Sequence, residues 1–373
     1  MVRKERLIQR FMDYVQIDSE TRSEGRFAET MKRELEQLGL DVIFDHAGEV
    51  VGSDGNNLIA RFKGVLPGEP LILSAHMDTV MPGKGIEPVL VDGIIRSRGN
   101  TILGSDNKGG VAAILEALEC LIEDGVALKP IEVILTIAEE GGLNGAKNLD
   151  FSLISGRRGF VLDSGGSPGN IDIMAPGQDK IDARILGKPS HAGMCPEDGI
   201  NAIQVAARAI DHMRLLRIDE ETTANIGIIH GGETTNIVCP EVIIRAEARS
   251  LDPQKLEEQT QHMVRCVEEA CREFGAESDI HAVRSYDGYS VESDDPWLLF
   301  VESVVRKAGL EPRLQRSGGG SDTNIYNGKG FSMLNLGTGM SKVHTTDEFI
   351  KVDDLVNLAT LVRLLIVEYA SMA

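Results

Sequence analysis

Two adjacent glutamates, Glu139 and Glu140, end an apolar run that reads IEVILTIA and precede Gly141-Gly142. A continuous run of Val, Ile and Leu is typical of a strand in a sheet that is covered on both faces. Two carboxylates at the end of such a strand are unfavourable unless a positive group lies beside them. Ligands of open α/β sheets bind at the carboxyl ends of the strands. The doublet therefore predicts a positively charged partner at this edge of the sheet.

The rest of the chain alternates between strand and helix patterns. Apolar strand patterns stop at His76 and Asp163, and a helical pattern covers residues 108–124 between them. From about residue 291 the chain returns to a helix, a strand and a final helix. This alternation predicts an α/β fold with a mostly parallel sheet and helices on both faces. We expect residues 1–177 and 291–373 to form this discontinuous catalytic domain.

Residues 178–290 have a different pattern. A strand is followed by a helix over 199–217, two strands, a helix over 253–275 and a last strand. The order βαββαβ is typical of a compact α+β sheet with two helices on one face. We expect this segment to be an inserted lid domain, with hinges near Pro176-Gly177 and Tyr286-Asp287-Gly288.

Charge and cysteine content exclude several classes of protein. The formal net charge is −20, which argues against binding to nucleic acid or to an anionic membrane, because both need a basic face. The five cysteines are scattered, as in proteins of a reducing cytoplasm. The N-terminus has no signal-peptide pattern, and no apolar run is long enough to span a membrane. We therefore expect a cytoplasmic protein.

Further acid and imidazole groups stand near predicted strand ends. His76, Asp78 and Asp163 lie where apolar strand patterns stop, Asp106 lies just before a helical pattern, and His344 follows the last predicted strand and its loop. Each alone has an ordinary explanation, such as a helix N-cap for Asp106, a structural histidine, or a solvated turn. Together on one sheet edge, the carboxylates would repel one another without a multivalent cation. Mixed imidazole and carboxylate ligands suit Zn²⁺, with Mn²⁺ or Co²⁺ as alternatives.

Asp78 stands two residues after His76. Its carboxylate can accept the second imidazole N–H, which would fix the tautomer and raise the basicity of His76 as a ligand. The alternative is that Asp78 caps a turn.

The segments HMDTV, GSDNKGG, AEEGGLNGA and VLD, with the late His344, resemble those of the cocatalytic-zinc metallopeptidases. This family includes peptidase T, aminoacylases and glutamate carboxypeptidases, and the order of the segments covers almost the whole chain. The SGGGSDTN segment and the length make the peptidase T branch the most similar.

The resemblance implies a site for two Zn²⁺ ions per subunit, with Co²⁺ or Mn²⁺ as substitutes. Asp106 matches the carboxylate that bridges the two ions. His76 and Asp163 match the other ligands of one ion, and Glu140 and His344 match those of the second.

The resemblance also implies catalytic roles. Glu139 matches the general base, and Asp78 matches the acid that orients a ligand. Within the family, Asp at the position of Asp163 is associated with aminopeptidases, whereas Glu is associated with deacylases and carboxypeptidases.

The inserted domain carries further matches. In PSHAG, His191 matches a histidine that polarises the scissile carbonyl, often in the other subunit. Asn236 and Arg249 match positions that hold the polar ends of the substrate. Gly319 and Gly320 belong to a glycine loop whose N–H groups can hold a carboxylate. The alternatives are a solvated loop residue for His191, a surface strand residue for Arg249 and a plain flexible turn for the glycines.

These features predict a dinuclear-zinc exopeptidase that hydrolyses short peptides, best described as a tripeptide aminopeptidase. The first alternative is a metal-dependent carboxypeptidase or N-acyl amino acid deacylase. A non-catalytic metal- or peptide-binding protein is the second alternative, and Glu139 argues against it because binding needs no general base. We expect a monomer or a homodimer formed through the lid domain.

Overall fold

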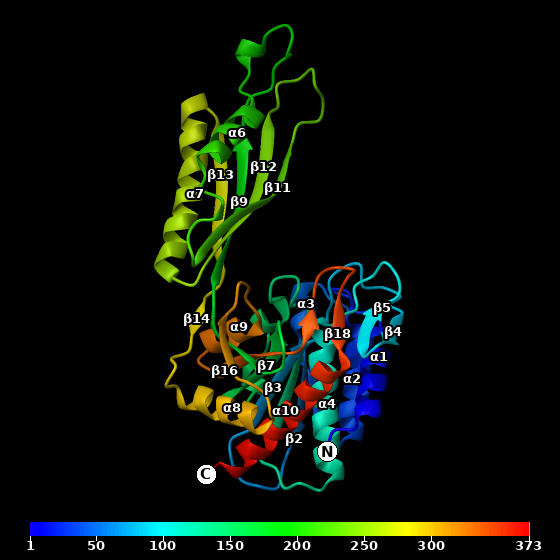
Figure 1. Ribbon diagram of the computed structural model, residues 1–373. Coiled ribbons are helices and arrows are strands. Elements are labelled where there is room, and N and C mark those ends of the chain that lie inside the picture. The colour runs from blue at the N-terminus through cyan, green and yellow to red at the C-terminus, as the bar shows by residue number, and fades with distance from the viewer. Residues whose placement is uncertain (373) are drawn as a thin grey trace. The chain divides into compact units, whose positions relative to one another are not determined.

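A computed structural model describes residues 1–372 of the protein. The chain divides into two compact units. The larger unit contains Met1–Ile173, Ser290–Ser317 and the chain from Ser321 onwards, and the smaller unit contains Met174–Tyr289 with Gly318–Gly320. Each unit is described by itself below (Figure 1).

A mixed sheet forms the centre of the larger unit. Its strands follow the order β1 (Asp41–Phe44), β2 (Leu58–Phe62), β6 (Ile131–Thr136), β3 (Leu71–His76), β7 (Arg158–Ser164), β16 (Ser332–Gly337), β8 (Asn170–Ala175) and β14 (Tyr289–Ser290), with β15 (Arg313–Arg316) paired to β8. The central strands β6, β3, β7 and β16 are parallel, whereas β2 and β8 run antiparallel to their neighbours. The predicted α/β class with a mostly parallel sheet is confirmed.

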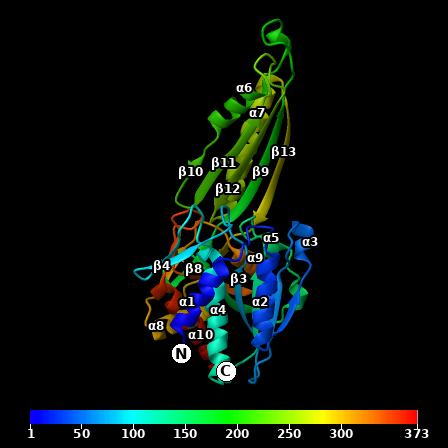
Figure 2. The same cartoon turned by 90° about the vertical axis from the view of Figure 1, so that its right-hand side faces the viewer.

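Helices cover both faces of this sheet. One face packs against α1 (Lys4–Val15), α2 (Gly25–Gln37), α4 (Ser105–Glu123), α8 (Pro296–Lys307) and α10 (Val352–Ser371). Figure 2 shows α1, α4 and α10 next to one another. The other face packs against α9 (Asp322–Gly328) through a separate cluster that contains Tyr326 and Val161.

Shorter elements complete the larger unit. They are α3 (Ala47–Val51), α5 (Asn144–Lys147), a 3₁₀ turn at Phe151–Leu153, and a small sheet of β17 (Met340–Ser341), β18 (Phe349–Lys351), β5 (Ile94–Ser97) and β4 (Pro88–Val91).

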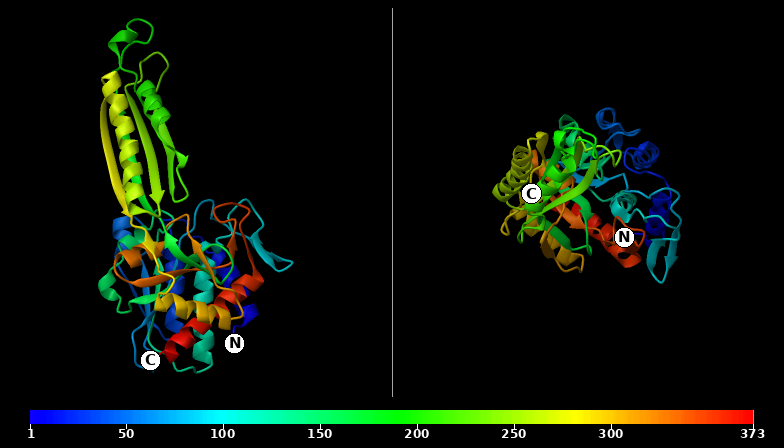
Figure 3. Two further views of the ribbon diagram at one scale, coloured as in Figure 1. Left: turned by 60° about the vertical axis from the view of Figure 1, so that its left-hand side comes forward. Right: turned by 90° about the horizontal axis from the view of Figure 1, so that it is seen from above.

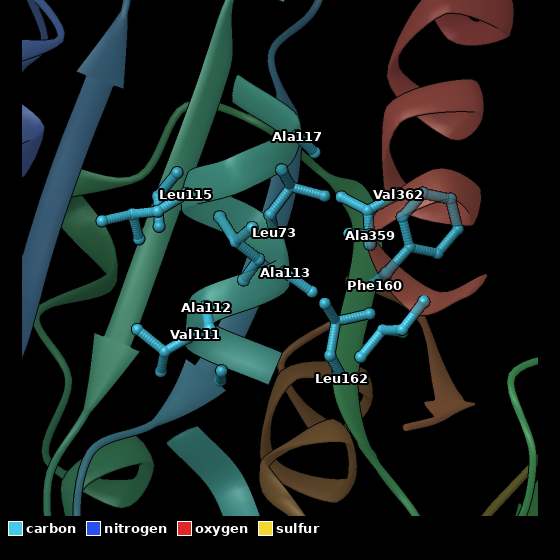
Figure 4. Packing of buried hydrophobic residues seen from close by; sticks show 14 of the residues in the cluster. Leu73, Val111, Ala112, Ala113, Leu115, Ala117, Phe160, Leu162, Ala359 and Val362 are labelled. Atoms are coloured by element: carbon cyan, nitrogen blue, oxygen red, sulfur yellow. The ribbon is translucent and has the colours of Figure 1, made fainter. Parts of the chain in front are cut away.

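Packing, rather than local propensity, holds α4 in place. Gly109 and Gly110 lie in its first turns, and each glycine weakens a helix by about 1 kcal/mol relative to alanine. Leu115 and Leu118 are fully buried, and burying one such side chain contributes roughly 1.5–3 kcal/mol. Figure 4 shows side chains of α4 among residues of β3, β7 and α10. A Cβ on Gly110 would lie 2.7 Å from the carbonyl oxygen of Leu162, so glycine lets α4 approach β7 closely.

The smaller unit is an α+β sheet. Its elements are β9 (Gly177–Leu186), a 3₁₀ turn at Pro196–Asp198, α6 (Ala202–His212), β10 (Leu216–Arg217), β11 (Thr222–Gly231), β12 (Glu241–Ser250), α7 (Pro253–Phe274) and β13 (Glu277–Tyr286). The strands pair antiparallel in the order β10-β11-β12-β9-β13. Helices α6 and α7 pack against this sheet (Figure 3).

Two details of the smaller unit differ from the sequence-based expectation. The helix predicted over 199–217 ends at His212, because Leu216 has a left-handed φ of 64° and pairs with Ala224 in β11. Gly318–Gly320 also join this unit, although they are far from residues 178–290 in the sequence.

Candidate metal centre

The larger unit gathers the predicted acid and imidazole residues beyond the carboxyl ends of its central strands. His76 is the last residue of β3, Asp163 lies near the end of β7, and Glu139 and Glu140 follow β6. Asp106 is the second residue of α4, where the backbone leaves helical geometry. His344 lies in the loop between β17 and β18.

The carboxylate of Asp106 is placed between two histidines. His76 Nε2 lies 3.0 Å from Asp106 Oδ1, and His344 Nε2 lies 3.2 Å from Asp106 Oδ2. On one side, His76 Nε2 is also 3.4 Å from Asp163 Oδ1. On the other side, His344 Nε2 is 2.9 Å from Glu140 Oε1. Each oxygen of Asp106 thus faces a different histidine–carboxylate pair, as a carboxylate that bridges two cations must.

The donor atoms fit metal binding. In two groups, His76 with Asp106 and Glu140, and His76 with Glu139 and Asp163, the ligand atoms lie within 4.8 Å of one another. Glu140 Oε1 is buried and accepts no hydrogen bond within the described chain, although His344 lies close to it. His344 Nε2 and Glu140 Oε1 thus lie close together without a hydrogen bond, as two ligands of one cation would. Imidazole and carboxylate donors together suit Zn²⁺, Mn²⁺ or Co²⁺.

The cluster carries more negative than positive charge, and its pKa values respond to this. Burial raises the pKa of Glu139 well above its usual range, and it raises the pKa of Asp163 to about 8. Burial by itself lowers the pKa of His76. The surrounding carboxylates raise this pKa by a larger amount, so the net shift is upward. The carboxylates of Asp106 and Glu140 raise the pKa of His344 to about 10. Protons therefore occupy this site at neutral pH, and a divalent cation would displace them.

Asp78 lies beside His76, as expected, but its backbone carbonyl is nearer to the imidazole than its carboxylate is. His76 Nδ1 lies 2.9 Å from the backbone carbonyl oxygen of Asp78, whereas the carboxylate Oδ1 is 3.4 Å away. The carboxylate instead accepts hydrogen bonds from the backbone N–H groups of Glu139 and Glu140, at 2.9 and 3.2 Å, and from Thr21 Oγ1 at 2.8 Å. The backbone of Asp78 orients the imidazole, and its side chain holds the glutamate doublet.

Glu24 is a second support that sequence reasoning missed. It is fully buried and accepts a hydrogen bond from the N–H of Ala138 at 3.0 Å and from Ser53 Oγ at 2.5 Å. Ala138 has a left-handed φ of 47°, which a residue with a Cβ adopts only under local constraint. Glu24 and Asp78 together fix the turn that carries Glu139. Nothing in the polar segment SETRSEG distinguishes Glu24 from a solvated residue.

Asn335 and Asn107 support Asp163, and the sequence pattern also missed them. Asn335 Oδ1 accepts a hydrogen bond from the N–H of Asp163 at 3.1 Å, and its Nδ2 donates to the buried Asp172. Asn107 Nδ2 donates to Asp163 Oδ1 at 3.1 Å. An amide within β16 or in the first turn of α4 gives no signal of this role before the two elements are packed.

The smaller unit holds the other predicted site residues. His191 is exposed, and its Nδ1 accepts hydrogen bonds from the N–H groups of Gly193 and Met194, both at 3.1 Å. In the neutral imidazole the proton is then on Nε2, which is free to donate. The backbone carbonyl of Asn236 accepts from the N–H of Ala192 at 2.9 Å, so Asn236 lies beside the His191 segment.

Arg249 and the glycine loop form a second group in the smaller unit. The guanidinium of Arg249 donates to Glu247, and its Nη1 would lie 3.6 Å from a Cβ on Gly319. A Cβ on Gly320 would lie 2.4 Å from the ring of Tyr286. Only glycine fits at position 320, which argues against a plain flexible turn.

None of the helices over residues 1–372 is both long and apolar enough to cross a membrane.

Comparison with known proteins identifies the family. Residues 72–368 match the model of peptidase family M20/M25/M40. The chain is 44% identical over 370 residues to uncharacterized protein YqjE of Bacillus subtilis strain 168, covering 99% of this chain and 100% of the relative. It is also similar to the crystal structure of aminopeptidase PepT from Bacillus cereus ATCC 10987, with 42% identity, a TM-score of 0.90 and 99% of each chain covered.

A tripeptidase from Staphylococcus aureus subsp. aureus Mu50 has a similar structure, with 39% identity, a TM-score of 0.95 and 100% of each chain covered. The resemblance to the metallopeptidases that include peptidase T is thereby confirmed, and so is the prediction of an enzyme that hydrolyses peptide bonds. The chain belongs to peptidase family M20/M25/M40.

Proposed function

We propose that this enzyme is a dinuclear, zinc-dependent aminopeptidase that removes the N-terminal residue from tripeptides. The observation that carries the proposal is Asp106, whose two carboxylate oxygens each face a different histidine. The similar structures named aminopeptidase and tripeptidase support the choice of substrate class.

The ligands divide into two sets in this proposal. His76 and Asp163 would hold one cation, Glu140 and His344 would hold the other, and Asp106 would contribute one oxygen to each. Divalent cations bound here would lower the pKa of a water molecule and polarise the scissile carbonyl. Co²⁺ or Mn²⁺ would substitute for Zn²⁺, because the same donors suit all three.

Glu139 is the general base in this proposal. Glu139 is 8% exposed, so little bulk water reaches it. Its backbone N–H is held by the carboxylate of Asp78. The carboxylate removes a proton from the attacking water and delivers it to the leaving amine, so that one group serves as base and then as acid. Glu139 also lies within one group of potential ligands, and metal analysis of a Glu139 variant separates the role of base from that of ligand.

The residues of the smaller unit bind the substrate in this proposal. His191 Nε2–H donates a hydrogen bond to the carbonyl oxygen as negative charge develops on it, which is worth about 3–4 kcal/mol for a well-placed donor. Arg249, Asn236 and the N–H groups of Gly319 and Gly320 hold the polar ends of the peptide.

A panel of peptides tests the proposal. We would incubate metal-free enzyme with Zn²⁺ or Co²⁺ and assay di-, tri- and tetra-alanine, together with trialanine that is acetylated at its N-terminus or amidated at its C-terminus. We expect fastest cleavage of free trialanine and release of its N-terminal residue. Activity that requires the acetyl group would favour a deacylase, and release of the C-terminal residue would favour a carboxypeptidase. Activity that persists in excess chelator would contradict the metal requirement.

A further inference from the structure

Glu348 is a buried carboxylate that follows His344 by four residues and is 1% exposed. Its four hydrogen bonds all come from one distant segment of the chain. The donors are the N–H groups of Leu103 (2.8 Å) and Gly104 (2.9 Å) to Oε2, and Ser105 Oγ (2.6 Å) and the N–H of Asp106 (3.1 Å) to Oε1.

This arrangement has an ordinary stabilising component. The N–H groups at the start of α4 have no carbonyl partner within the helix, and a negative charge is favourable at a helix N-terminus. Gly104 has a left-handed φ of 77° at the N-cap, and as a glycine it has no side chain that could accept from these donors. Glu348 therefore replaces the missing N-cap side chain.

The position of Glu348 also connects it to the metal centre. Through His344, its loop reaches Asp106 Oδ2 at 3.2 Å and Glu140 Oε1 at 2.9 Å. Glu348 in turn holds the N–H of Asp106 itself. One short loop thus contacts Asp106 at two places: His344 faces the carboxylate of Asp106, and the carboxylate of Glu348 accepts a hydrogen bond from the backbone N–H of Asp106.

We propose that Glu348 is a positioning residue for the metal centre, which fixes the backbone of Asp106 so that its two oxygens face the two halves of the site. This inference rests on the proposed dinuclear function. Glu348 touches neither substrate nor cation in this proposal and acts only through Asp106 and the His344 loop.

The chemistry of the side chain makes the proposal testable. A carboxylate accepts at both oxygens, whereas the amide of Gln accepts at one end and donates at the other. In Glu348→Gln, an NH₂ group must face either the N–H groups of Leu103 and Gly104 or the N–H of Asp106. Ser105 can rotate its hydroxyl to accept from an NH₂ group, so the end that faces Ser105 and Asp106 is the easier one to reverse. The bond to Asp106 is then lost.

The test is a titration of metal-free full-length protein with Co²⁺, followed by visible absorption and by metal analysis. The matched control is Asp347→Asn, which removes one negative charge at the neighbouring position, where the side chain is 77% exposed and contacts Lys342 at 3.5 Å. We expect wild type and Asp347→Asn to bind two Co²⁺ ions alike. We expect Glu348→Gln to bind the second ion on the order of 10- to 100-fold more weakly, as for other residues that support metal ligands, with a lower kcat and an unchanged KM for a tripeptide.

The outcomes separate the two proposals. Glu348→Gln that binds Co²⁺ with the affinity and spectrum of Asp347→Asn would overturn the positioning role and leave the proposed function standing. A wild-type protein that binds no Co²⁺ would overturn both. Should Glu348→Gln fail to fold, Ser105→Ala decides, because it deletes one of the four bonds and keeps the charge. We expect Ser105→Ala to lower the affinity for the second Co²⁺ ion several-fold, and wild-type affinity in this variant would contradict the proposal.

Discussion

Asp78 Oδ1 accepts a hydrogen bond from the backbone N–H of Glu139 at 2.9 Å. The second oxygen of the same buried carboxylate accepts from the N–H of Glu140 at 3.2 Å. One side chain therefore sets the direction of two consecutive residues with different proposed tasks. Because both N–H groups bond the same carboxylate, loss of that carboxylate would release the backbone of both glutamates.

Asp78→Asn should lower kcat by about 10- to 100-fold, the usual effect of losing a residue that orients a ligand. An amide accepts at only one end, so one of the two N–H groups loses its partner. The backbone carbonyl that faces His76 Nδ1 is unchanged. Steady-state kinetics on a tripeptide would measure the effect. Thr21→Val is the control, because it removes the hydroxyl contacts with Asp78 Oδ2 and the Thr79 carbonyl and keeps both bonds from the doublet. Equal kcat values for Asp78→Asn and Thr21→Val would contradict the role in holding the doublet.

Glu139→Gln should keep both metal ions and lose turnover by about 10²- to 10⁴-fold, the range for removal of a general acid–base group. The amide cannot take a proton, but the proposed ligands Glu140 and Asp163 are untouched. Metal analysis after dialysis, together with kcat, measures the two effects separately. Glu140→Gln is the matched control, because it changes the neighbouring residue in the same way and should lose metal. Loss of metal from Glu139→Gln would assign Glu139 as a ligand instead.

The sequence could predict the metal cluster because the ends of buried strands can be recognised from where apolar runs stop. Parallel strands end at one edge of the sheet, so His76, Glu139 and Asp163 had to meet once β3, β6 and β7 were recognised. The apolar runs of these strands are continuous and short, and their length favours buried strands over buried helices. The location of the cluster therefore followed from local pattern alone.

The supports of the cluster could not be predicted in this way. Glu24 and Glu348 lie in polar segments, where a carboxylate ordinarily faces water, and only the packed fold buries them. The left-handed φ of Ala138 depends on such contacts and leaves no mark on residue choice. The side chain of Asp78 bonds the doublet while its backbone carbonyl bonds His76, and this division likewise depends on how β3 and β6 lie side by side.

Cation affinity should rise with pH on the alkaline side of neutrality. In the metal-free protein, burial raises the pKa of Asp163 to about 8, and nearby carboxylates raise that of His344 to about 10. Both groups hold a proton at neutral pH, and a cation must displace these protons to bind. As pH rises through these pKa values, fewer protons compete and binding strengthens. Calorimetry in buffers of different ionisation enthalpy would measure the released protons, and a pH-independent affinity without proton release would contradict this account.

Glu116→Gln should destabilise the larger unit at neutral pH but not in acid. Glu116 is fully buried on α4 and accepts hydrogen bonds from Arg6 Nε at 2.7 Å, Arg10 Nη1 at 3.1 Å and the N–H of Arg3 at 2.8 Å. Burial by itself raises the pKa of Glu116, but the arginine hydrogen bonds outweigh it, so the net shift is downward. Its folded pKa lies below its unfolded pKa, so the charged group stabilises the fold above the unfolded value. That stabilisation is lost as pH falls through the folded pKa.

Breaking a buried ion pair costs about 3–5 kcal/mol. Arg6 and Arg10 are partly exposed, at 23% and 13%. We therefore expect Glu116→Gln to lower the free energy of unfolding by about 2–3 kcal/mol at neutral pH. Glu119→Gln is the matched control, since Glu119 contacts the same two arginines but is 22% exposed. Thermal unfolding of both variants and wild type across a pH series measures the difference. We expect Glu116→Gln to unfold several degrees below Glu119→Gln at neutral pH and the gap to close in acid, because protonated Glu116 no longer pairs with the arginines. A gap that persists in acid would attribute the effect to packing rather than to charge.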